Sequence, residues 1–190
     1  MHIEADLVKA CQQNDAKAQT TFYNLYKSYL FGICIRYAKS KEEAEDIFQE
    51  AFARIFEGIK KVKNPEAIDY WVKQVVVNTA INYYKKHLKF NQIKDYEYLA
   101  YQSSNQDHLK IMDDLTTTEL LKIINELPDG YRVVFNLYVI DGYTHPEISK
   151  LLGITASTSK SQLSRAKELI RSKLKKCGIT SYEKQTGSIG

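Results

Sequence analysis

The sequence predicts an all-α protein made of two small helical domains joined by a flexible linker. Only three prolines and eight glycines occur in 190 residues. Apolar residues recur at three- and four-residue spacing along most of the chain, which is the period of a helix that buries one face. This pattern breaks once, in a polar and tyrosine-rich stretch. We therefore predict domains at residues 1–89 and 115–178, a linker at 90–114 and a flexible tail at 179–190.

The net charge is only +4, but its distribution is informative. Ser40–Glu57 is acidic and Lys160–Lys176 is basic, which predicts one surface for a basic protein partner and another for a polyanion. The three cysteines are scattered, so no zinc site, disulfide framework or cofactor is predicted. No signal peptide or membrane-spanning apolar run is visible, so we expect a cytoplasmic chain without membrane insertion.

The first domain is expected to begin with a helix over about Ile3–Gln12. Asn14 or Asp15 can then cap a long second helix, and Ser40 with Glu43 forms a capping box that starts the third. The stripe that the second helix should bury consists of Ala18, Phe22, Leu25, Tyr26, Tyr29, Leu30, Ile33 and Tyr37.

The third helix has an apolar face from Ala44 to Ile59 that should pack inward. The opposite face of this helix is acidic, and an acidic helix face is usually solvated surface. A divalent-metal site at Asp46 and Glu50 is a second reading, but no histidine or further carboxylate is placed to complete it. The residues of this face are Asp46, Gln49, Glu50 and Ala53.

Asn64-Pro65-Glu66 signals the cap and first turn of a helix that runs to about His87. Its expected inner stripe is Ile68, Val72, Val75, Val76, Thr79 and Tyr83. A second line of aromatic, amide and amine groups suits single-stranded nucleic acid, since it can stack a base, read its edge and hold its phosphate. A purely structural, buried Trp71 is an equally good reading. The line comprises Trp71, Gln74, Asn78, Asn82 and Lys85, and Lys86 and Lys89 extend it at the end.

The second domain should open with a helix capped by Thr116. A Pro-Asp-Gly turn at residues 127–130 then leads into a helix over Tyr131–Ile140. This helix is expected to bury Val134, Phe135 and Leu137.

Residues 141–176 predict two helices joined by a tight turn. Thr144 and Glu147 form a capping box, Gly153 supplies the turn, and Thr155 caps the second helix. That helix buries one apolar face and carries a basic one. We interpret the motif as a helix-turn-helix whose second helix fits a major groove. A plain helical hairpin with a solvated basic face is the alternative, but the caps, the turn and the basic charge all point to DNA binding. The apolar face is Leu163, Ala166, Ile170 and Leu174.

The order of these pieces resembles the extracytoplasmic-function group of bacterial RNA polymerase sigma factors. Ala44–Phe52 is similar to that family's segment for docking on the clamp helices of the polymerase. Trp71–Tyr83 resembles its strand-opening and minus-ten recognition helix, and Leu127–Phe135 with Gly153–Ala166 resembles its minus-thirty-five reader. The resemblance implies sigma region 2 and region 4 domains in a factor that binds core RNA polymerase, at clamp helices and flap, and opens promoter DNA.

The resemblance also implies roles for individual residues. The resemblance also allows an anti-sigma protein as a further partner, and we expect the chain to be a monomer. The polymerase contacts would be Asp46, Gln49, Glu50 and Ala53. The minus-ten and single-strand contacts would be Val62, Trp71, Gln74, Asn78, Asn82, Lys85 and Lys86. The minus-thirty-five contacts would be Thr158, Lys160, Ser161, Gln162, Ser164, Arg165, Lys167 and Arg171.

This sequence departs from the family pattern at two positions. Ser159 stands where the family often has an apolar residue, which predicts looser packing of the second helix. Gln162 stands where an arginine is common, so one phosphate-binding charge is missing.

Two other functions compete with this reading. A stand-alone helix-turn-helix regulator would bind duplex DNA by itself, usually as a dimer on a palindrome, but the sequence shows no coiled-coil seam. A metal-dependent nuclease would use Asp46 and Glu50. No set of residues suggests covalent catalysis, so we expect no enzyme, and His145, beside a cap, is expected at the surface.

Overall fold

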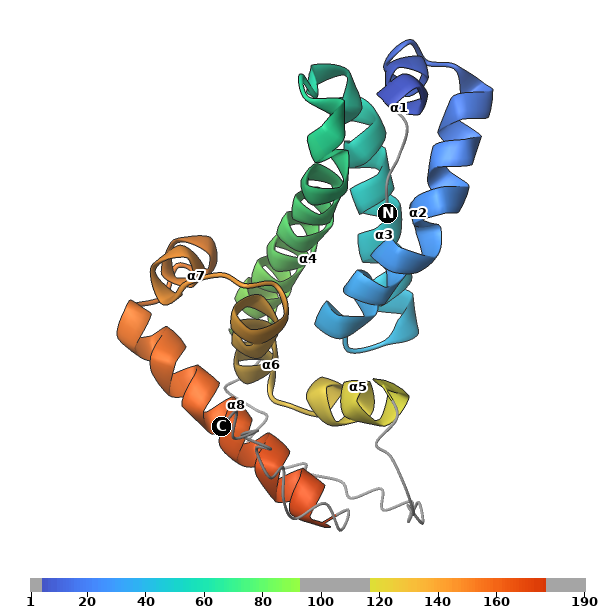
Figure 1. The fold of residues 1–190 in the computed structure, drawn as a ribbon. Helices are drawn as coiled ribbons and strands as arrows, with labels where there is room; N and C mark the ends of the chain where they lie inside the picture. The colour runs from blue at the N-terminus through green and yellow to red at the C-terminus, as the bar shows by residue number, and fades with distance from the viewer. Residues whose placement is uncertain (1–4, 93–116, 177–190) are drawn as a thin grey trace, which may run out of the picture. The chain divides into compact units, whose positions relative to one another are not determined.

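The computed structural model describes residues 5–92 and 117–176, and these two parts consist of helices and turns without a strand (Figure 1). The all-α prediction is therefore confirmed. The chain divides into two compact units, which we describe separately. Within the described parts, no helix is both long and apolar enough to cross a bilayer. The expected cap Thr116, the tail, and the linker beyond Gln92 lie outside the described residues.

The first unit is a bundle in which α2, α3 and α4 pack on one another and α1 packs on α2 (Figure 1). Two 3₁₀ turns, η1 and η2, connect α3 to α4. The elements are α1 (Ala5–Gln12), α2 (Ala16–Tyr37), α3 (Lys41–Gly58), η1 (Ile59–Lys61), η2 (Pro65–Ala67) and α4 (Ile68–Gln92).

Side-chain caps begin α2 and α3 as expected. Asp15 rather than Asn14 caps α2, with its Oδ1 accepting from the amide of Ala18 at 2.8 Å. Ser40 Oγ accepts from the amide of Glu43 at 3.2 Å. The Glu43 carboxylate reaches one residue further back than in the usual capping box and accepts from the amide of Lys39 at 2.8 Å.

The buried stripe of α2 is narrower than predicted. Leu25 and Tyr29 are 41% and 48% exposed, so assigning them to the core was wrong. Both lie beside the line that faces α3 and α4, and a helix at the edge of a bundle buries only the side its neighbours cover. Cys34 is buried as well. The buried residues of α2 are Ala18, Phe22, Tyr26, Leu30, Ile33, Cys34 and Tyr37.

The apolar face of α3 packs inward as expected. Phe48, at the edge of that face, is half-buried and meets Phe52 at a ring-centroid distance of 4.8 Å. Tyr23 and Phe31 of α2 complete this aromatic contact, with Tyr23 4.8 Å from Phe52 and Phe31 5.5 Å from Phe48. The fully packed residues of α3 are Ala44, Ile47, Ala51, Phe52 and Ile55.

α4 buries more than the single stripe predicted for it. Val72, Val76 and Thr79 are buried as expected, while Val75 and Tyr83 are only half-buried. α4 packs on both α2 and α3, so two sides of it are covered. It also continues through Gln92, past the predicted end near His87. The additional buried residues are Val77, Ala80 and Ile81.

In the second unit, α6 begins earlier than predicted. Asp129 and Gly130 belong to its first turn rather than to a separate turn, and Pro128 is its N-cap. An acidic residue in a first turn complements the positive end of the helix dipole, which favours this start. α6 continues directly into a π-helical turn, η3. The elements from residue 117 on are α5 (Thr117–Asn125), α6 (Asp129–Phe135), η3 (Asn136–Ile140), α7 (His145–Leu152) and α8 (Ala156–Lys176).

An unexpected buried arginine lies at the corner between α5 and α6. Arg132 is 3% exposed and pairs with the carboxylate of Asp129 at 3.1 Å. It also donates to the carbonyl of Asn125 at 3.3 Å, so its charge is compensated at the corner. The neighbouring core contains Ile123, Ile124, Leu127, Ala166 and Ile170, with Tyr131, Phe135, Ile140 and Leu174 packed against it.

Candidate protein and nucleic-acid interfaces

The acidic face predicted on α3 is exposed. Asp46, Gln49, Glu50 and Ala53 all lie at the surface, because the opposite side of α3 forms the core of the unit. Glu50 is paired with Arg54, one turn later, at 2.6 Å. A pair this exposed contributes only about 0.3–0.5 kcal/mol, so a partner's cation can readily replace it. The arrangement suits a docking surface for a basic protein.

The alternative prediction for this face, a divalent-metal site at Asp46 and Glu50, is not supported. Within residues 5–92 and 117–176, no group of three or more histidine, cysteine or acidic side chains is arranged to hold a metal ion.

The line predicted on α4 is exposed in part. Asn78, Asn82 and Lys86 are exposed, and Gln74, Lys85 and the preceding-loop residue Val62 are half-buried. Trp71 is half-buried and packs over Gly58, where an added Cβ would lie 2.9 Å from Cζ2 of the indole. Trp71 therefore fits both predictions in part, the structural tryptophan and the exposed contact, because its ring packs on α3 while part of it reaches solvent.

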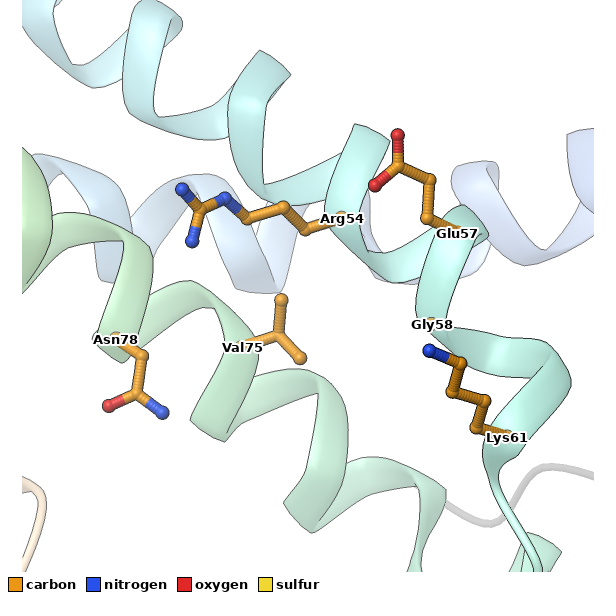
Figure 2. A pocket seen from close by; sticks show the side chains of 6 residues that line it. All are labelled: Arg54, Glu57, Gly58, Lys61, Val75 and Asn78. Atoms are coloured by element: carbon orange, nitrogen blue, oxygen red, sulfur yellow. The ribbon is translucent and has the colours of Figure 1, made fainter.

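A pocket of about 390 Å³ lies between α3 and α4 (Figure 2). The sequence predicted Asn78 as a nucleic-acid contact, but it placed Val75 in the buried stripe and gave Arg54 no role, because no local pattern shows that residues some twenty positions apart face one another. The pocket combines cationic, amide and apolar groups, which suits a nucleobase with its phosphate. Its lining is Arg54, Glu57 and Gly58 of α3, Lys61 of η1, and Val75 and Asn78 of α4.

The acidic face of α3 adjoins the C-terminal half of α4. The pKa of Tyr83 is raised, first by burial and then by the nearby carboxylates of Glu43 and Asp46. The Tyr83 ring stacks on His87 with centroids 4.3 Å apart. A protein bound to the acidic face and a strand bound along α4 would therefore be neighbours.

The helix-turn-helix is formed as predicted. The amide and Oγ1 of Thr144 donate to the Glu147 carboxylate at 2.8 and 2.7 Å. Gly153 has φ of 70°, a left-handed conformation that glycine adopts without a Cβ clash. Thr155 Oγ1 accepts from the amide of Thr158 at 3.0 Å and so caps α8.

Most of the polar residues predicted to contact DNA lie on the exposed face of α8. Arg165 is within 3.7 Å of Glu168, and both side chains are largely exposed, so this pair leaves Arg165 available. The hydroxyl of Thr158, which is half-buried, is shared with Thr155 at 2.8 Å. The exposed residues are Lys160, Ser161, Ser164, Arg165, Lys167 and Arg171.

Gln162 lies elsewhere. Its side chain is half-buried against α6, with Nε2 3.0 Å from the position of a Cβ on Gly130, and its Oε1 is buried. Gln162 therefore packs within the unit instead of extending from the exposed face.

Ser159 does not leave the packing loose, contrary to the expectation. It is fully buried, and its Oγ lies 2.9 Å from Nδ1 of His145. His145 is half-buried rather than at the surface, and its ring stacks on Tyr138 with centroids 4.5 Å apart. Burial, and then the charges of Lys160 and Lys167, lower the pKa of His145.

Comparison with known proteins agrees with both halves of this description. The family model of Sigma-70 region 2 matches residues 22–89, and that of Sigma-70, region 4 matches residues 117–170. RNA polymerase sigma factor SigV of Bacillus subtilis is 28% identical over 151 residues, covering 80% of this chain and 87% of that protein. ECF RNA polymerase sigma-E factor of Haemophilus influenzae is 27% identical over 179 residues, covering 88% of this chain and 93% of that protein.

A solved structure shares the fold. The sigma factor RpoE, crystallised with the anti-sigma factor NepR from Bartonella quintana, matches with a TM-score of 0.51 at 18% identity, covering 82% of this chain and 96% of that one. The two family models follow one another along the chain in the order that the motifs predict. The chain therefore belongs to the sigma-70 family of RNA polymerase sigma factors, in its extracytoplasmic-function group, and is a transcription initiation factor that directs the polymerase to promoters.

Proposed function

We propose that the first unit, taken as residues 1–89, docks on the clamp helices of core RNA polymerase through Asp46, Gln49, Glu50 and Ala53. The observation that carries this proposal is the exposure of this acidic face above a fully packed apolar one. Complementary charge would speed and orient the encounter. Since Glu50 is held only by an exposed pair with Arg54, little free energy opposes its transfer to a polymerase cation.

The test is a pull-down on core polymerase with Asp46→Lys and Glu50→Lys combined. We expect retention to be lost. The matched control reverses Asp6 and Glu66, which are also exposed but lie outside this face, and it should be retained like wild type. Full retention of the Asp46 and Glu50 variant would remove this surface from the proposal.

We also propose that the unit opens the minus-ten element and traps the non-template strand along Trp71–Lys86. Extruding a base costs a few kcal/mol, and stacking returns about 1–3 kcal/mol per base. Stacking on Trp71 therefore needs polar contacts beside it. The pocket, lined by Asn78, Arg54 and Lys61 together with Glu57, supplies an amide and two cations against one carboxylate. It supports a place for an extruded base between α3 and α4, beside η1, which contributes Lys61.

Asn78→Ala should impair opening, seen as loss of permanganate reactivity in promoter DNA, while polymerase binding remains. Asn24→Ala is the control, because Asn24 is an exposed asparagine on α2 outside the pocket. If the Asn78 variant opened promoters like wild type, the pocket would have no part in melting.

For the second unit, residues 115–178, we propose that the N-terminal half of α8 reads the minus-thirty-five element. Lys160, Ser161, Ser164 and Arg165 would meet base edges, and Lys167 and Arg171 would hold phosphates. Thr158 would act mainly through the cap, and we leave the packed Gln162 out of the contact set. Arg165→Ala should relax preference at one or two base pairs by about 1–3 kcal/mol. An unchanged selected motif would make Arg165 a backbone contact only.

The remaining partners follow from this role. The chain would act by binding, as a monomer and without catalysis, in the cytoplasm where polymerase and promoters meet. An anti-sigma factor, as in the solved relative, would be its inhibitor. A stand-alone regulator would instead select the same DNA without polymerase. Mapping start sites with purified core polymerase, with and without the chain, separates the two, since only a sigma factor creates new starts.

A further inference from the structure

One polar group interrupts the apolar side of the DNA-reading helix. Ser159 is 0% exposed, whereas Leu163, Ala166 and Ile170, which follow it on the same side, are apolar. A buried hydroxyl left without a partner costs about 1–3 kcal/mol. Ser159 Oγ instead lies 2.9 Å from Nδ1 of His145, the first residue of α7. A hydrogen bond thus joins the two helices of the motif where the fold otherwise uses apolar contact.

His145 is also held from a third element. Its ring stacks on Tyr138 of η3, with centroids 4.5 Å apart and planes 22° apart. Its backbone follows Thr144, which is fixed by its bonds to Glu147. The imidazole therefore has one face on η3 and one nitrogen on α8, and this combination restricts its rotamer.

The groups around the imidazole favour its neutral form. Burial lowers the pKa of His145, and the nearby charges of Lys160 and Lys167 of α8 lower it further. Tyr138 faces it from η3, and Glu147 belongs to its own helix. A neutral imidazole has one donor and one acceptor nitrogen, so Nδ1 can bond a serine hydroxyl in either tautomer.

The position of Ser159 determines where its neighbours in α8 project. Lys160 and Ser161 follow it directly and are exposed. Successive helical residues are related by a fixed rotation and rise, so any rotation of α8 that moved Ser159 would swing both side chains. Base-edge contacts depend on such geometry, while phosphate contacts through long cationic side chains tolerate it.

We propose that Tyr138, His145 and Ser159 form a clamp that sets the orientation of α8 on α7, and that His145 and Ser159 are therefore positioning residues for reading the upstream promoter element. The inference rests on the proposed function of α8. It assigns to the serine, which departs from the family's apolar pattern, a structural partner in the preceding helix.

The test uses the full chain with core RNA polymerase on a promoter library randomised at the upstream and downstream elements. Sequencing the transcripts gives the discrimination at each element. Ser159→Ala removes the hydroxyl, and His145→Phe removes Nδ1 while keeping a ring for Tyr138. His145→Asn keeps a hydrogen-bonding group near the place of Nδ1. Circular dichroism melts establish that each variant is folded at the assay temperature.

We expect Ser159→Ala and His145→Phe each to lower upstream discrimination by about 2- to 10-fold, the range that one hydrogen bond contributes. The double variant should fall no further, because both changes remove the same bond. His145→Asn should stay within about twofold of wild type, and downstream discrimination, read by the other unit, should not change. If His145→Phe does not fold, Ser159→Ala and His145→Asn decide by the same criteria.

Two results would overturn the clamp: wild-type upstream discrimination in Ser159→Ala, or independent losses that multiply in the double variant. Failure of the proposed function looks different. In that case the wild-type chain itself would direct no sequence-selective transcription from the library.

Discussion

The contact between Gly58 and Trp71 gives a sharp test of how α3 and α4 fit together. Replacing Gly58 by alanine adds a Cβ 2.9 Å from Cζ2 and 3.3 Å from Cη2 of the indole. Carbon atoms normally meet at about 3.5–4.0 Å, so the ring must move. The backbone itself accepts alanine, since Gly58 has φ of −85° and ψ of −22°.

The magnitude follows from two opposing effects. Alanine in place of a helical glycine stabilises by up to about 1 kcal/mol, while overpacking a packed site costs about 1–3 kcal/mol. Gly32 in α2 is the matched control, because a Cβ there meets nothing within 4 Å. We expect the Gly32→Ala variant to be more stable than wild type. The Gly58→Ala variant should be less stable than the Gly32→Ala variant by about 1–3 kcal/mol, because both share the gain in helix propensity and only Gly58→Ala overpacks its site.

The assay is urea unfolding followed by tryptophan emission. Trp71 is the only tryptophan in the chain, so the native emission reports its surroundings directly. Emission should shift to the red in Gly58→Ala, as the ring is displaced toward solvent, and stay unchanged in Gly32→Ala. Promoter opening should weaken in the Gly58 variant alone. Equal stabilisation of both variants with identical emission would refute the packing of Trp71 on Gly58.

Three further predictions concern stability. Tyr26 is buried and donates to Asp69 Oδ1 at 2.5 Å, and Tyr26→Phe should cost about 1.5–3 kcal/mol in urea unfolding, as expected for a bond to a charged group; a cost near zero would argue against that bond. Gly153→Ala should cost about 1–2 kcal/mol because φ is 70°, with Gly153→Asn losing less, and equal losses would contradict the backbone argument. The lowered pKa of His145 predicts that its contribution to stability is full above about pH 6.5 and falls below it, because the unfolded chain takes up the proton first. Melting temperatures of His145→Asn should therefore depend less on pH across that range, and parallel curves would contradict the assignment.

Local features of this protein could be read from the sequence alone. The caps at Asp15, Ser40 and Thr155 and the glycine at Gly153 involve atoms within about one turn of each other, so neighbouring residues suffice to predict them. The acidic face of α3 is equally legible, because helical periodicity alone separates it from the apolar stripe. The order of motifs along the chain then identified the family.

Other features depend on which helices pack together. Leu25 is exposed, Val77 is buried, and Arg54 meets Asn78 across a pocket only because of where α2, α3 and α4 lie. In the second unit, the pairing of His145 with Ser159 joins residues 14 positions apart. Periodicity describes one helix at a time, whereas burial and contact are properties of pairs of helices. The sequence therefore determined the helices, their capped starts at Asp15, Ser40 and Thr155, and most of their polar faces. The tertiary structure decided which of their side chains meet.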